Sequence, residues 1–70
     1  MSKQNMQKTA ASFLDSGYEY SCKGDNDKAI VDYNRAIYFD PNNYEAYYLR
    51  GIVYYEKKIT IKQSKTIINL

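Results

Sequence analysis

The chain is similar to itself at a spacing of 34 residues. A shift of this length superposes five pairs of related residues: Phe13 and Tyr47, Leu14 and Tyr48, Gly17 and Gly51, Tyr20 and Tyr54, and Lys23 and Lys57. The glycine pair is the most informative, because glycine within a helix costs about 1 kcal/mol relative to alanine and needs a packing reason. A repeat of this length predicts a unit of two short helices that buries its apolar face against neighbouring units.

The first strong helix prediction lies between Gly24 and Pro41. Apolar residues there recur at steps of three and four, which is typical of a helix, and we expect it to run from about Asn26 to Phe39. The acidic residues that precede it can cap its free amides. Asp40 stands directly before the proline, which disfavours helical geometry and therefore ends the helix.

The same periodicity predicts a helix on each side of this one. The segment at residues 9–23 and the segment at residues 44–58 both carry apolar residues at helical steps. Asn42 and Glu45 have the spacing of a capping box, so we expect Asn42 to cap the third helix. The predicted architecture is a chain of three helices joined by short turns.

These residue types at these positions resemble the tetratricopeptide repeat (TPR) family. One full unit runs from Ala10 to Asn43, and a second unit opens at Tyr44. The resemblance implies an all-α fold of antiparallel helix–turn–helix repeats, a short α-solenoid with three helices and a segment that could form a fourth. It assigns repeat packing to Phe13, Gly17, Tyr20, Ala29, Tyr33, Ala36 and Pro41 in the first unit, and to Tyr47, Gly51 and Tyr54 in the second.

The resemblance divides the chain into three parts. Residues 1–9 are a leader that could extend the first helix, residues 10–43 form the first repeat, and residues 44–70 form a partial second repeat. Beyond Lys58 the sequence ITIKQSKTIINL departs from the family pattern. We expect residues 60–70 to be a divergent or truncated second helix of that unit. Their β-branched residues would also tolerate a strand, and a frayed tail is a third alternative.

The composition argues against catalysis. The chain has no histidine, which is the commonest general base and metal ligand, and its one cysteine, Cys22, has no histidine to activate it. The run that begins at Asp25 lacks the fifth-position oxygen ligand, the glycine and the glutamate of a calcium loop. We therefore expect no enzyme activity, no cofactor and no metal site.

Charge and apolar patterning limit the partners and the compartment. Ten basic residues stand against eight acidic ones, a balance too even to imply nucleic acid or an anionic membrane as a partner. A single cysteine excludes an internal disulfide, and no apolar stretch has the length of a signal peptide or a membrane span. We expect a cytoplasmic protein.

In TPR proteins the first helix of each unit lines a concave groove that holds a peptide or a helix of a partner. The resemblance places Leu14 and Tyr18 of the first unit, and Tyr48, Ile52 and Tyr55 of the second, in this groove. An exposed strip of apolar and aromatic residues of this kind marks an interaction site. The same residues could instead pack inside, against the leader or the tail. The implied function is a protein-interaction module or scaffold.

Two further functions remain open. An incomplete array of repeats could self-associate into a homo-oligomer, because repeats of this kind bury their cores by stacking. RNA could bind the basic run that ends the chain, formed by Lys57, Lys58, Lys62 and Lys65, beside tyrosines that can stack on bases. RNA affinity would then fall steeply with salt.

Overall fold

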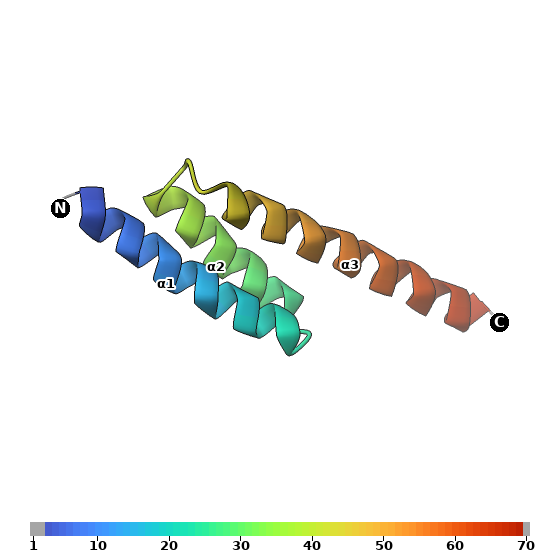
Figure 1. The fold of residues 1–70 in the computed structure, drawn as a ribbon. Coiled ribbons are helices and arrows are strands. Elements are labelled where there is room, and N and C mark those ends of the chain that lie inside the picture. Colours follow the sequence, from blue (N-terminus) through green and yellow to red (C-terminus); the bar gives the residue numbers. More distant parts are fainter. Residues whose placement is uncertain (1–2, 70) are drawn as a thin grey trace.

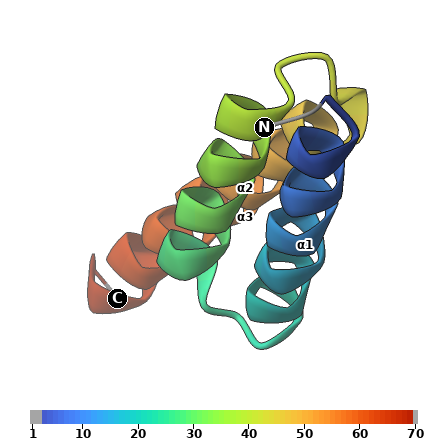
Figure 2. The ribbon, with the colours of Figure 1, turned by 90° about the vertical axis from the view of Figure 1, so that its left-hand side faces the viewer.

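The structure is a computed structural model that describes the backbone of residues 3–69 and the side chains of residues 5–6 and 8–59. It consists of three helices: α1 (Lys3–Cys22), α2 (Asn26–Phe39) and α3 (Tyr44–Asn69). α1 and α2 are antiparallel, and α3 runs in the direction of α1 along the other side of α2 (Figures 1 and 2). The all-α prediction is confirmed, and the second helix has the predicted bounds.

A glycine determines the turn between α1 and α2. Gly24 has a φ of 82°, a left-handed conformation that side chains disfavour. Its N–H donates to the carbonyl of Ser21 at 3.1 Å, and the N–H of Asp25 donates to the carbonyl of Tyr20 at 2.9 Å. This pair of bonds is a Schellman motif, which satisfies the last carbonyls of α1 and reverses the chain. Asp25 then caps α2, accepting from the N–H of Lys28 at 3.4 Å.

The turn between α2 and α3 uses a different asparagine from the one that the sequence predicts. Asp40 leaves helical geometry before Pro41, as expected, with φ −142° and ψ 86°. The prediction that Asn42 caps α3 is wrong, because α3 begins at Tyr44 and Asn42 lies within the turn, where its N–H donates to the Asp40 carboxylate at 3.3 Å. Asn43 is the cap, and its Oδ1 accepts from the N–H of Ala46 at 3.2 Å.

The second repeat does not turn where the first one does. α3 continues as one helix to Asn69, so the separate fourth helix and the alternative strand are not formed over the described residues. The residue 34 positions after Gly24 is Lys58, whose side chain favours the right-handed helix over the left-handed turn. No glycine or proline follows it to end the helix. The carboxyl-terminal part of α3 therefore projects beyond the α1–α2 pair (Figure 1).

The core lies between α2 and its two neighbours. α2 packs extensively on both α1 and α3, whereas α1 and α3 touch each other little. Tyr33 of α2 is fully buried and packs against Gly17 of α1. Ala46 and Val53 of α3 are also buried and belong to the same core cluster. At one end of the pair, the rings of Phe13 and Phe39 stack with their centroids 5.7 Å apart.

Candidate functional site

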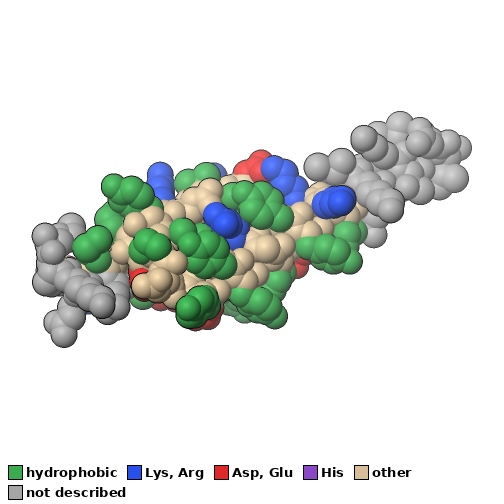
Figure 3. Space-filling model, turned by 90° about the horizontal axis from the view of Figure 1, so that it is seen from above, with side chains coloured by type: hydrophobic (Ala, Val, Ile, Leu, Met, Phe, Trp, Pro, Cys, Tyr) green, Lys and Arg blue, Asp and Glu red, His purple; other side chains and the backbone are tan. Residues whose placement is uncertain are grey.

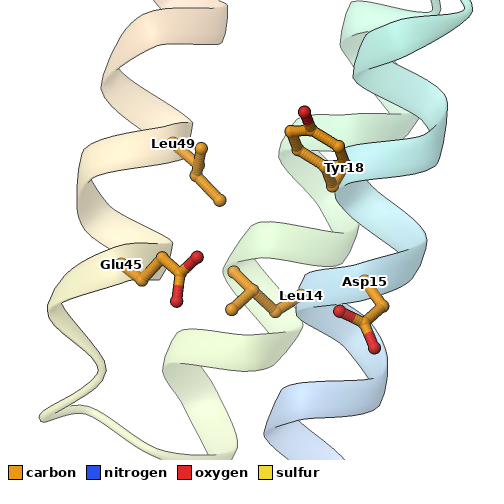
Figure 4. Close-up of a pocket in the computed structure, with 5 residues that line it drawn as sticks. All are labelled: Leu14, Asp15, Tyr18, Glu45 and Leu49. Carbon is orange, nitrogen blue, oxygen red and sulfur yellow. The ribbon is translucent and has the colours of Figure 1, made fainter.

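A cavity of about 280 Å³ opens between α1 and α3 (Figure 4). Leu14, Asp15 and Tyr18 of α1 line one side of it, and Glu45 and Leu49 of α3 line the other. The cavity exists because α2 packs against both helices and holds them apart, so that they flank a gap instead of filling it. Figure 4 shows the side chains of Leu14, Glu45 and Leu49 pointing into this gap.

The structure brings together two of the five predicted groove residues. Leu14 and Tyr18 both line the cavity, although Leu14 is only 9% exposed and also belongs to the core. Tyr48, Ile52 and Tyr55 do not line the cavity and lie exposed on α3. Their spacing of four and three residues places them on one side of that helix. The predicted strip therefore consists of a cavity and an adjoining exposed face.

Three residues of the cavity, Asp15, Glu45 and Leu49, are not among the five predicted groove residues. Asp15 lies three residues before Tyr18, and Leu49 lies four residues after Glu45, which is a groove position of the family pattern. Residues three or four apart share a helix face, so both could have been found by extending the groove face along each helix. The family pattern alone does not indicate them.

Two cations of α3 bond to α2 and not to the cavity residues. Arg50 donates from Nη1 to Oδ1 of Asn34 at 2.7 Å, and Lys57 donates from Nζ to Oδ1 of Asp27 at 2.6 Å. Asn34 and Asp27 belong to α2, so both bonds clamp the two helices together. The bond to Asp27 raises the pKa of Lys57 above its ordinary value, and the charge of Asp27 adds to this effect. Lys57 therefore serves as a contact between α2 and α3, and its charge is already paired with Asp27.

The repeat-packing residues on the helices of the first unit are covered by a neighbouring helix, whereas those of the second unit are exposed. In the first unit Gly17 lies against the ring of Tyr33 and the carbonyl of Ala29. Tyr33 and the two alanines assigned to packing are fully buried, and burial raises the pKa of the Tyr33 phenol. Phe13 and Tyr20 pack partly buried against the same core, and Pro41 is exposed in its turn.

In the second unit the equivalent face is open. No other part of the described structure lies within 4 Å of a Cβ placed on Gly51, and Tyr47 and Tyr54 are 41% and 50% exposed. The structure thus differs here from the predicted packing role, because no described helix covers this side of α3. Hydrophobic side chains gather along the face seen in Figure 3, with lysine and arginine side chains between them.

Other kinds of site find little support in the described part of the chain. It contains no group of three or more cysteine, aspartate or glutamate residues placed to hold a metal ion. None of its helices is long and apolar enough to cross a membrane. Cys22 is exposed at the end of α1. Of the basic run, Lys62 and Lys65 lie outside the residues whose side chains are described.

A family model described as the TPR repeat matches residues 17–58, which are 42 of the chain's 70 residues. The chain belongs to the TPR family. The match extends from the close contact of α1 with α2, through all of α2, to the middle of α3. TPR repeats generally mediate protein–protein interactions and are typically not catalytic. No curated protein and no solved structure matches the chain significantly.

Proposed function

We propose that this TPR protein binds a peptide or a helix of a partner protein along the groove between α1 and α3. The observation that carries the proposal is the cavity lined by Leu14, Tyr18 and Leu49 beside an exposed aromatic face of α3. Such a surface combines a half-open pocket, lined by apolar and acidic side chains, with exposed aromatic side chains. Aromatic anchors supply much of the energy in protein contacts.

The groove has the dimensions of a short recognition element. Tyr48 and Tyr55 are seven residues apart, which is about 10 Å along a helix at 1.5 Å per residue. Ile52 stands between them on the same side. About two turns of a partner helix, or about three residues of an extended peptide, would span this distance.

Selection of peptides displayed on phage tests the proposal directly, because it needs no partner chosen in advance. Random peptides are selected on the wild-type chain and counter-selected on a variant with Tyr48→Ala, Ile52→Ala and Tyr55→Ala. We expect enriched peptides whose affinity falls by about a hundredfold or more in this variant, since three anchors worth about 1 kcal/mol or more each sum to about 3 kcal/mol or more. Tyr38→Ala is the control, because Tyr38 is an exposed tyrosine on α2, outside the cavity lining and the α3 strip.

The selection can also refute the proposal. If no peptide is enriched over the counter-selection, the groove is not a binding site. Enriched peptides that bind the triple variant as tightly as the wild type would place the binding surface elsewhere. Loss of affinity in the Tyr38→Ala control would also place the binding surface outside the groove. Circular dichroism of each variant checks that the helices persist, which we expect because these side chains are exposed.

A second candidate function, self-association, is favoured by the open face of the second unit. Tyr47, Gly51 and Tyr54 repeat a face that α2 covers in the first unit, and in the second unit nothing described covers it. A second copy of the chain could supply this cover in a symmetric dimer. Sedimentation equilibrium over micromolar to millimolar concentration would show the dimer, and Tyr47→Ala with Tyr54→Ala should weaken it. A folded monomer throughout this range would refute self-association.

A further inference from the structure

The walls of the cavity carry two carboxylates that have no cationic partner in the described part of the chain. Asp15 stands on the α1 side and Glu45 on the α3 side, and Figure 4 shows the side chain of Leu14 between them. Three of the other six acidic residues form ion pairs: Asp25 with Lys28, Asp27 with Lys57, and Asp32 with Arg35. Glu19, Asp40 and Glu56 form none in the described part of the chain. The cavity therefore combines the apolar side chains of Leu14 and Leu49 with two carboxylates that no described cation neutralises.

The acidic and basic residues of α3 lie on different sides of the helix. Glu45, Leu49, Ile52 and Glu56 follow one another at steps of four, three and four residues, so they share the side of the helix that faces the groove. Arg50 and Lys57 lie on the other side, bonded to α2. Although the net charge of the chain is +2, the groove side of α3 is acidic.

We propose that the cavity receives a lysine or arginine side chain from a basic amphipathic segment of the partner. This inference rests on the proposed function, because it names the chemistry of the segment that occupies the groove. The aliphatic part of such a side chain packs on Leu14 and Leu49, while its cationic head reaches the carboxylate of Glu45. A second basic side chain of the same segment reaches the carboxylate of Asp15 on the other side of Leu14. Long basic side chains commonly bury their methylenes and keep the charge at a polar edge in this way.

The alternatives fit the cavity less well. A purely apolar side chain would bury the two carboxylates against hydrocarbon without a partner, and an unpaired polar group is costly to desolvate. An acidic side chain would add a third negative charge. The cavity of about 280 Å³ is half open to solvent, so a side chain of a docked segment can enter it. The ring of Tyr18 adds a cation–π surface for the same group.

Two synthetic peptides test the inference. Both are amphipathic helices of about 14 residues, or four turns, with the same leucine positions; one has lysine and the other glutamate at the polar positions. Binding is measured by fluorescence anisotropy at about 150 mM salt, where unspecific attraction is screened over about 8 Å. We expect the lysine peptide to bind and the glutamate peptide not to bind.

Matched variants locate the contact. Asp15→Asn with Glu45→Gln should weaken the lysine peptide by about five- to thirtyfold, as expected for two ion pairs of about 0.5–1 kcal/mol each. Glu19→Gln is the control, because this exposed acid of α1 does not line the cavity; it should change affinity by less than about twofold. Both acids of the cavity are exposed, so neither substitution endangers the fold.

The outcomes separate this inference from the proposed function. Equal binding of the two peptides, or preference for the glutamate peptide, overturns the basic partner but leaves a peptide-binding groove. An equal loss of affinity in the control and in the double variant overturns the site, because it shows attraction to any acid. Binding of neither peptide overturns the inference, and the phage selection then decides whether the groove binds peptides at all. Selected peptides that use the groove but lack basic residues would also contradict it.

Discussion

Two glycines at equivalent positions of the repeat should respond in opposite ways to the same substitution. At Gly17, an added Cβ would lie 2.7 Å from Cδ1 and Cε1 of Tyr33 and 3.2 Å from the carbonyl oxygen of Ala29. The Tyr33 ring is fully buried, so it cannot swing aside without disturbing the core. Overpacking of this kind costs about 1–3 kcal/mol. The substitution also replaces a helical glycine by alanine, whose higher helix propensity stabilises the folded chain by about 1 kcal/mol.

At Gly51 only the second effect operates. A Cβ there meets no atom within 4 Å outside the local helix, so Gly51→Ala should stabilise the chain by about 1 kcal/mol. Gly17→Ala should range from neutral to a loss of about 2 kcal/mol. Because the gain in helix propensity is common to both variants, the difference between them measures the cost of crowding Tyr33 alone. We expect this difference to be about 1–3 kcal/mol, with Gly17→Ala the less stable.

Urea denaturation followed by circular dichroism at low micromolar concentration gives both free energies of unfolding. Thermal denaturation gives a second measure, at about 4–8 °C per kcal/mol for a domain of this size. Equal effects of the two substitutions would refute the close contact of α1 with α2. A concentration-dependent loss of stability in Gly51→Ala would instead show that a second copy packs against Gly51, because alanine would then hinder that contact.

Three further predictions concern the turns and the charges. Gly24→Ala should cost about 1–2 kcal/mol in urea denaturation, since its φ of 82° is unfavourable for any residue with a Cβ; an unchanged stability would contradict the left-handed turn. Asn43→Ala should lower the free energy of unfolding by about 1 kcal/mol and Asn42→Ala by less, because only Asn43 caps α3. The reverse order would instead support Asn42 as the cap. Lys57 should titrate above the ordinary lysine value of 10.5, and Asp27→Asn should lower its pKa in an NMR titration. Since the folded-state pKa is raised, the contribution of this pair is fully present below pH 10.5 and is lost as the pH rises through the raised value.

The sequence predicts the helices well where turn chemistry is strong. Gly24 and Pro41 bound α2 from both sides, and its predicted limits agree with the structure. The cap of α3 is predicted one residue too early, because neighbouring asparagines have nearly the same local pattern. In the structure the N–H of Asn42 donates to the Asp40 carboxylate inside the turn, and the side chain of Asn43 caps the helix. That contact follows from the three-dimensional path of the turn, which residue spacing does not specify.

The site is less predictable than the fold because it depends on two helices that are distant in sequence. The repeat pattern predicts Leu14 and Tyr18 in the groove, yet whether they face a cavity depends on how far α2 holds α3 from α1. Asp15 and Leu49 become part of the site only through that separation. The open face around Gly51, in contrast, follows from the incomplete second repeat: repeats bury their cores by stacking, and no described fourth helix covers Tyr47 and Tyr54.

The two faces of α3 make peptide binding and self-association separable. In the first unit α2 covers Gly17, whereas Tyr18, the next residue, stays on the groove side about 100° further around the helix. The 34-residue repeat superposes Gly17 on Gly51 and Tyr18 on Ile52, so Ile52 lies on the groove side and Gly51 lies about 100° away from it around α3. A second copy packed on Gly51 would therefore leave Ile52 and the cavity free to hold a peptide. Substitutions on the Gly51 side should change the oligomeric state without changing peptide affinity, and substitutions on the Ile52 side should do the reverse. Loss of both properties from either set would mean that one contact, spanning both faces, accounts for all binding by α3.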